Sequence, residues 1–227
     1  TKNLEIKLRD DGKFSESFIE RILSEHCDTL RFLGPLNQKL GRKILLVGGA
    51  GYIGIPITQL FLKWGFNVRC LDSQIYSHDR CIHPLMGLDG YEYIHGDLRD
   101  IGIIEKALKG VSDVIILAGL VGDPITKKYP VASKEINDVG LKNFIEALSE
   151  YHLNKVIFIS TCSNYGEISG NEMASESFKL NPLSLYAQSK VKIEKLITGL
   201  KGKVKYSGTI LRFATAFGLS GRMRFDL

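Results

Sequence analysis

A short apolar run followed by three spaced glycines constrains the fold of this chain more than any other feature. The run "RKILLVG" leads into "GGAGYIG", in which Gly48, Gly51 and Gly54 precede a helical stretch. Glycine is needed where a turn is tight, where backbone approaches a pyrophosphate and where a helix lies close to a strand. The helix N-terminus then offers N–H groups and partial positive charge to phosphates. The pattern predicts a dinucleotide site in an α/β domain.

An acidic residue ends the second predicted strand. A carboxylate at Asp72 can accept hydrogen bonds from both ribose hydroxyls of NAD and would repel the 2′-phosphate of NADP. Ser73 and Gln74 follow it, so no adjacent arginine or lysine can receive that phosphate. The sequence therefore favours NAD over NADP.

From about residue 43, short β-branched runs alternate with longer helical stretches, as in parallel βαβ units. Runs that are apolar throughout, such as "VIILAG", suit a sheet covered by helices on both faces. With right-handed crossovers, this is a Rossmann-type doubly wound parallel sheet. The predicted strands are 42–48, 66–72, 91–97, 112–119, 155–160 and 205–213, and helical stretches follow Gly51 and Asp100 and lie around 133–150 and 183–200.

The first 42 residues lie outside this alternation. Apolar residues recur at helical spacing from the candidate N-cap Ser15 to Leu30, and "GPLNQKLG" is typical of a linker. We expect an N-terminal helical extension over 1–42 and an NAD-binding domain over 43–227. The extension is expected to pack outside the domain or at a subunit contact, with a regulatory or docking role as the alternative.

Composition excludes several classes of partner. The 44% hydrophobic content suits a buried core, and the net charge of +5 comes from scattered basic residues, so no nucleic-acid partner is indicated. The most apolar stretch, 114–121, is too short to span a bilayer, and the charged start has no apolar signal core. We therefore expect a cytoplasmic protein with no membrane partner. No metal is expected, because Cys27, Cys70, Cys81 and Cys162 lack metal-ligand spacing and are expected to be reduced thiols.

Tyr186 and Lys190 stand four residues apart in "SLYAQSK". On a helix they share one face and can contact the same small molecule. The spacing alone also occurs by chance in many surface helices, so its meaning depends on the rest of the chain.

Six motifs over residues 43–227 together resemble one known family. They are "GGAGYIG", "HGDLRD", "LAGLVGDP", "STCSNYG", "NPLSLYAQSK" and "LRFATAFG". Their order and spacing are similar to those of the extended short-chain dehydrogenases/reductases, in particular the NAD-dependent nucleotide-sugar epimerases and dehydratases. The resemblance implies a nucleotide-sugar substrate, NAD as cofactor and, as an open possibility, a homodimer.

The same resemblance assigns the cofactor and substrate contacts. Asp97 is expected at the adenine, with Leu98 beside it. For Ser160 we favour capping of the local backbone over a ligand contact. The implied cofactor-binding residues are Gly48, Gly51, Tyr52, Ile53, Gly54, Asp72, Asp97, Leu98, Leu117, Ala118, Gly119, Ser160, Tyr186, Lys190 and Phe213, and the implied substrate-binding residues are Val121, Asn137, Ser163 and Thr215.

The catalytic residues implied by the resemblance are Thr161, Tyr186 and Lys190. Hydride removal from a sugar carbon requires a base for the hydroxyl proton. A tyrosine with the ordinary pKa of about 10 is a poor base at neutral pH, and lowering that pKa to about 7 takes about 4 kcal/mol of phenolate stabilisation. Lys190 and the positive nicotinamide can supply it, and Lys190 can also hold the ribose. Thr161 would orient the substrate hydroxyl.

Departures from the family pattern narrow the activity. Cys162 and Ser163 stand where the 4,6-dehydratases carry an Asp-Glu pair, which argues against dehydration. Val121 and Thr215 replace a lysine and an asparagine of some epimerases, which leaves the sugar and epimerisation itself open. Family members usually continue beyond "RMRFDL", so the C-terminal substrate lobe is expected to be truncated.

The resulting expectation is epimerisation of a nucleotide sugar through a transient keto intermediate, with Tyr186 as the base. The alternatives are a sugar-nucleotide dehydrogenase or reductase without hydride return, and a non-catalytic NAD-binding scaffold.

Overall fold

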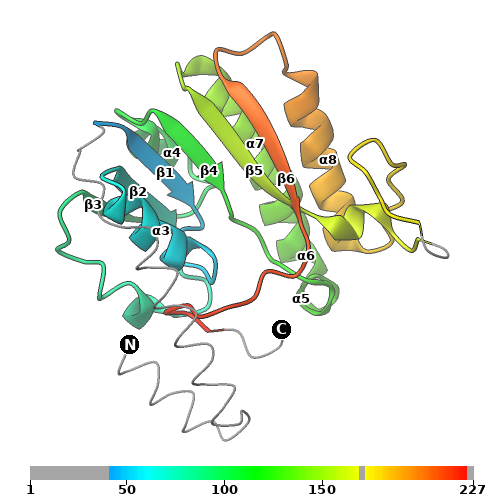
Figure 1. Ribbon diagram of the computed structural model, residues 1–227, viewed down its shortest axis with the longest axis horizontal. Helices are drawn as coiled ribbons and strands as arrows, with labels where there is room; N and C mark the ends of the chain where they lie inside the picture. Colours follow the sequence, from blue (N-terminus) through cyan, green and yellow to red (C-terminus); the bar gives the residue numbers. More distant parts are fainter. Residues whose placement is uncertain (1–40, 169–171, 224–227) are drawn as a thin grey trace, which may run out of the picture.

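Six parallel strands form the sheet of the computed structural model, which describes residues 41–168 and 172–223 (Figure 1). In the spatial order β3-β2-β1-β4-β5-β6, strands are added outward from β1 to one edge and then from β4 to the other, as in a doubly wound fold. This confirms the predicted fold class. The strands are β1 Lys43–Val47, β2 Asn67–Asp72, β3 Tyr91–His95, β4 Asp113–Ile116, β5 Lys155–Thr161 and β6 Ser207–Phe213.

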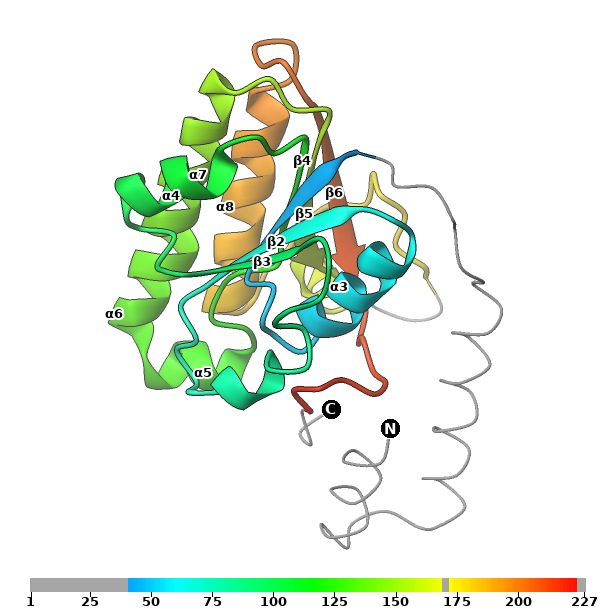
Figure 2. The same ribbon diagram turned by 90° about the vertical axis from the view of Figure 1, so that its left-hand side faces the viewer.

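Helices cover both faces of the sheet. Figure 2 shows α3 on one face and α4, α7 and α8 on the other. Asp100 caps α4 by accepting from the Ile103 N–H, and Ser184 caps α8 by accepting from the Ala187 N–H. The α-helices in the described residues are α3 Gly54–Lys63, α4 Ile101–Leu108, α5 Asp123–Lys128, α6 Pro130–Ser133, α7 Leu141–Ala147 and α8 Leu185–Gly199, with a π-helical segment, η2, at Lys134–Gly140. Short 3-10 turns are η1 Asp79–Cys81, η3 Leu148–Glu150 and η4 Cys162–Tyr165.

Two apolar layers hold these helices on the sheet. Alternate residues of β1 divide between them: Leu45 and Val47 belong to the layer under α4, α7 and α8, whereas Ile44 and Leu46 belong to the layer under α3. Because both faces are buried there, the central strands β1 and β4 have no polar alternation. This is why the apolar runs marked the strands in the sequence.

The helical stretch predicted around 133–150 is divided into α6, the π-helical segment, α7 and a 3-10 turn, and α5 was not predicted. The predicted N-terminal helix lies outside the described residues, and the division at residue 42 stays a prediction. Within the described part of the chain, no helix combines the length and the apolar character needed to cross a membrane.

Candidate active site

A cavity of about 620 Å³ lies at the carboxyl ends of the strands. The register explains why the predicted residues meet there: Val47 pairs with Leu71 on one side and with Ile116 on the other, so the segments that follow these three residues begin at one level. All the residues predicted for the site line this cavity except Asn137.

The glycine turn after β1 leaves no room for side chains at two positions. Gly48 has a φ of +82°, and a Cβ there would lie 2.7 Å from the Ala118 Cα. A Cβ on Gly54 would lie 2.4 Å from the Gly49 carbonyl oxygen. The N-cap of α3, Ile53, contributes no side-chain hydrogen bond, and the first turn holds no acidic residue. The positive end of α3 therefore faces the cavity without a competing carboxylate from its own first turn.

Asp72 joins the end of β2 to this turn. Its Oδ2 accepts from the Ala50 N–H at 3.0 Å, and its Oδ1 accepts from the Gln74 N–H at 2.8 Å. A carboxylate has about four acceptor positions, so each oxygen keeps capacity for a further donor. Asp72 can therefore brace the turn and accept hydroxyl groups from the cavity side.

Asp97 lies further along the cavity wall, after β3. Arg99 donates to both of its oxygens, with Nη2 at 2.7 Å and Nε at 3.0 Å, and also pairs with Glu135. The hydrogen bonds from Arg99 hold the pKa of Asp97 below its usual range. Asp97 is thus an anion at neutral pH, able to accept but not to donate.

Asn137 lies behind the loop that follows β4. Its Oδ1 accepts from the Leu120 N–H at 2.8 Å, and its Nδ2 donates to the Leu120 carbonyl at 2.9 Å. Gly119 passes so close that a Cβ there would lie 2.9 Å from the Asn137 Oδ1. The side chain predicted to contact substrate is therefore hydrogen-bonded to the loop that lines the cavity and is not itself part of the cavity wall.

Hydroxyl groups gather where β5 ends. The Thr161 Oγ1 accepts from the Ser163 N–H and donates to the Ser163 Oγ, both at 3.2 Å. Ser160 donates to the Glu194 carboxylate at 2.5 Å and accepts from Asn164. Its hydroxyl is thus taken up by side chains rather than by the local backbone, contrary to the sequence prediction. Among the described residues, Cys70, Cys81 and Cys162 are free thiols, and Cys162 is the exposed one.

Tyr186 and Lys190 occupy the N-terminal part of α8. The Lys190 Nζ donates to the Ile159 carbonyl at 2.8 Å and lies 4.5 Å from the centroid of the Phe158 ring and 5.7 Å from that of Tyr186. Burial lowers the pKa of Lys190 to about 8, and the negative charge of Glu194 opposes that shift. The helix thus presents a cation against the tyrosine ring at a largely dry position.

Comparison with known proteins identifies the family of this chain. A sequence model described as the NAD dependent epimerase/dehydratase family matches residues 44–226. The chain belongs to that family. A putative UDP-glucose 4-epimerase from Methanocaldococcus jannaschii is 32% identical over 180 residues, which are 77% of this chain and 56% of that protein. A UDP-glucose 4-epimerase from Lactobacillus helveticus is 26% identical, over 78% of this chain and 53% of that protein.

Solved structures of similar fold include two epimerases. A UDP-glucose 4-epimerase of Thermus thermophilus in complex with NAD superposes with a TM-score of 0.67 at 29% identity, over 75% of this chain and 54% of that one. A UDP-glucuronic acid 4-epimerase of Bacillus cereus in complex with UDP-glucuronic acid and NAD gives a TM-score of 0.69 at 29% identity, over 75% and 55%. The chain spans about half the length of the curated relatives it matches.

Sequence reasoning missed two residues after β2 and one after β6 that line this cavity. Tyr76, His78 and Arg222 line the cavity, with the Arg222 guanidinium 4.6 Å from the centroid of the Tyr76 ring. Burial lowers the pKa of His78; Asp72 opposes the shift and Arg222 adds to it. No motif marks these residues, because they meet only when segments far apart in the chain fold together.

Proposed function

We propose that this protein is an NAD-dependent nucleotide-sugar epimerase in which Tyr186 acts as the base. The observation that carries the proposal is that Thr161, Tyr186 and Lys190 line the same cavity as the glycine turn and Asp72. The relatives named above are 4-epimerases of UDP-sugars, which supports a nucleotide sugar as the substrate class.

The residues present fit NAD. The cavity volume of about 620 Å³ falls within the range of about 300–1,000 Å³ typical of ligand sites. Backbone N–H groups at the start of α3 would meet the pyrophosphate, and Asp72 has acceptor capacity for ribose hydroxyls. When bound, NAD would supply the hydride acceptor for oxidation of a sugar carbon and return that hydride afterwards.

The residues of this chain then divide the proton chemistry. Tyr186 would take the proton of the substrate hydroxyl as the keto group forms and return it in the second half of the reaction. Lys190, held at the Ile159 carbonyl, would stabilise the phenolate by its positive charge. Thr161 would hydrogen-bond the substrate oxygen, using the acceptor and donor capacity that it shares with Ser163.

Dehydration is not supported by these residues. The 4,6-dehydratases that this chain resembles carry an Asp-Glu pair directly after this threonine, and Cys162 and Ser163 provide no carboxylate there. Chemistry confined to oxidation and reduction at one carbon is therefore favoured.

The test compares Tyr186→Phe with Tyr151→Phe, a tyrosine that packs on the core and is not part of the cavity wall. Tyr186→Phe should lower kcat for interconversion of UDP-glucose and its C4 epimer by about 10²–10⁴-fold, the usual contribution of a positioned base. NAD affinity, measured by isothermal titration, should stay unchanged in both variants. Normal turnover by Tyr186→Phe would contradict the proposed base.

Substrate deuterated at C4 distinguishes epimerisation from the other activities. An epimerase should retain the deuterium in the product without net NADH. Accumulation of reduced cofactor that carries the deuterium would indicate a dehydrogenase instead. NAD binding without turnover of any nucleotide sugar would indicate a scaffold.

A further inference from the structure

A buried carboxylate, Glu194, lies one turn beyond Lys190 and two turns beyond Tyr186 on α8. Residues four apart share a helix face, so the three side chains form one row. The Glu194 side chain is 4% exposed. A buried charge is tolerated only when it is paired and hydrogen-bonded, so its partners show what the burial accomplishes.

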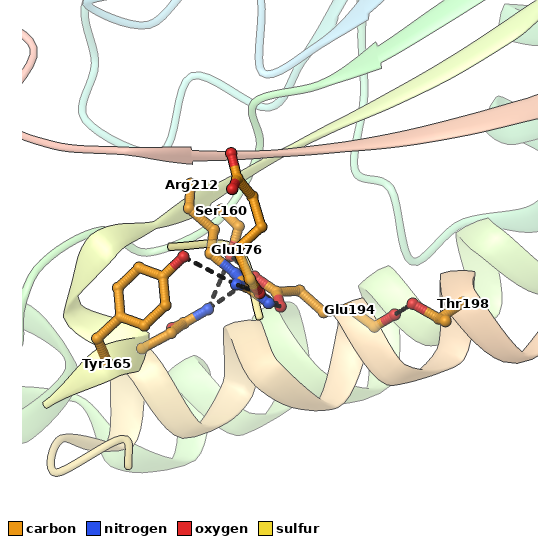
Figure 3. Close-up of polar contacts among 7 residues, drawn as sticks. Ser160, Tyr165, Glu176, Glu194, Thr198 and Arg212 are labelled. Atoms are coloured by element: carbon orange, nitrogen blue, oxygen red, sulfur yellow. Dashed lines mark hydrogen bonds and ion pairs between the residues drawn. The ribbon is translucent and has the colours of Figure 1, made fainter. Parts of the chain in front are cut away.

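Three neighbouring segments supply those partners (Figure 3). Ser160 Oγ donates to Oε1 at 2.5 Å and Asn164 Nδ2 donates to the same oxygen at 2.7 Å. Arg212 donates through Nη2 to Oε2 at 2.7 Å and through Nε to both oxygens. One carboxylate of α8 thereby holds the end of β5, the turn η4 and the end of β6.

Each partner stands next to a residue of the cavity wall. Ser160 precedes Thr161, Asn164 follows Ser163, and Arg212 precedes Phe213. Loss or shortening of the Glu194 side chain would therefore allow α8 to move relative to the strand end that carries Thr161.

Arg212 extends the connection to the segment that leads into α8. Its Nη1 donates to the Tyr165 Oη at 2.9 Å and to the Glu176 carbonyl at 3.1 Å, and the guanidinium lies 5.1 Å from the centroid of the Tyr165 ring. The planar guanidinium fixes the direction of these bonds, which a lysine could not reproduce.

We propose that Glu194, held by Arg212, is a positioning residue that sets where Tyr186 and Lys190 stand relative to Thr161. This inference rests on the proposed function, because it assigns those three residues to one reaction. The Glu194 charge also acts on Lys190: it raises the pKa of Lys190 and so opposes the larger, opposite effect of burial. The other groups that face the Lys190 ammonium are Tyr186 on α8 and the Phe158 ring and Ile159 carbonyl on β5.

Asp113 at the start of β4 offers a matched control. It is a buried carboxylate that accepts from an arginine and a serine hydroxyl, with Arg42 Nε at 3.0 Å and Ser112 Oγ at 2.7 Å, and it is not part of the cavity wall. Asp113→Asn therefore removes a second buried carboxylate that is paired with an arginine, away from Tyr186; the Arg42 side chain is 44% exposed, against 20% for Arg212.

The experiment measures kcat, KM, NAD affinity and unfolding midpoint for Glu194→Gln, Glu194→Asp and Asp113→Asn. Glu194→Gln should lower kcat by about 10- to 100-fold, the cost of an ångström-scale misplacement, with KM and NAD affinity nearly unchanged. Asp113→Asn should lose stability and keep kcat. If Glu194→Gln does not fold, Glu194→Asp, which retains the charge but shortens the side chain, should still show the selective loss of kcat.

An NMR titration of lysine labelled with ¹³C at Cε gives a readout independent of turnover. Lys190 should titrate near pH 8 in the unmodified protein and at lower pH in Glu194→Gln. If the unmodified protein converts no nucleotide sugar, the proposed function is wrong. An unchanged Lys190 titration in Glu194→Gln would overturn the inference about Glu194, whether or not the protein turns over a nucleotide sugar. If turnover exists and Glu194→Gln behaves like Asp113→Asn in kcat, this inference alone is overturned.

Discussion

Replacing Lys190 with methionine is expected to stabilise the NAD-free protein at pH 7 while removing its activity. Burial lowers the pKa of Lys190 from 10.5 to about 8. At 1.36 kcal/mol per pKa unit, holding this charge in the folded state costs about 3 kcal/mol. The variant also loses the hydrogen bond to the Ile159 carbonyl, worth about 1 kcal/mol. The free energy of unfolding should therefore rise by about 2 kcal/mol.

The pH dependence separates this reason from a simple packing effect. Below pH 8 both the folded and the unfolded state hold the proton of Lys190, so the full cost is present. Between pH 8 and 10.5 the folded state has released the proton and unfolding takes one up, so the stability of the unmodified protein rises with pH. At pH 9.5 about 2 kcal/mol of the cost is relieved, and the advantage of Lys190→Met should fall to nearly zero.

Urea unfolding at pH 7 and pH 9.5 measures both differences. With an m-value of about 2 kcal/mol/M, the midpoint of Lys190→Met should lie about 1 M higher at pH 7 and coincide with that of the unmodified protein at pH 9.5. Lys192→Met is the control, because Lys192 pairs with Asp138 at the surface and its loss should cost less than about 1 kcal/mol. A Lys190→Met variant that is less stable at pH 7, or whose advantage does not change with pH, would refute the reasoning.

Two further results are expected. Asn137→Leu leaves the buried N–H and carbonyl of Leu120 without these partners. The free energy of unfolding should therefore fall by about 3 kcal/mol, and NAD affinity should weaken. An unchanged urea midpoint and an unchanged affinity would show that the loop after β4 keeps its conformation without Asn137. Cys162 should react with a maleimide far faster than Cys70, whose thiol is buried and has a raised pKa. Because Cys162 lines the cavity, NAD together with a nucleotide sugar should slow its labelling, as measured by mass spectrometry of the peptides. Equal labelling with and without these ligands would show that they bind elsewhere.

The sequence was sufficient for the fold because its signals are local. Strands buried on both faces are continuous apolar runs, and the tight turn at Gly48 permits no side chain. Each of these features can therefore be recognised within one short segment of the sequence. The parallel order then brings strand ends together, which is why residues predicted from separate motifs line one cavity. The assignment of chemistry to those residues remains a prediction.

The details that the sequence could not supply depend on contacts between distant segments. Glu194 looks like an ordinary charged helix residue, and only the fold surrounds it with Ser160 and Arg212. Likewise, nothing in the sequence around Asn137 indicates that its amide bonds the backbone of Leu120, because the partner lies in another segment. The π-helical segment that carries Asn137 also departs from the helical period on which sequence patterns rest.

The strand order places the residues proposed for cofactor binding and those proposed for chemistry on different sides of the sheet's reversal between β1 and β4. Gly48 and Asp97 follow β1 and β3, and Asp72 ends β2. Thr161 and Tyr186 belong to β5 and α8, on the other side of the reversal. Each group is braced locally, Asp72 by the glycine turn and α8 by Glu194. Substitutions in one group therefore need not disturb the other, except at Tyr186 and Lys190, which are also expected to contact the cofactor. NAD affinity and turnover are separate readouts for the residues assigned to one group alone.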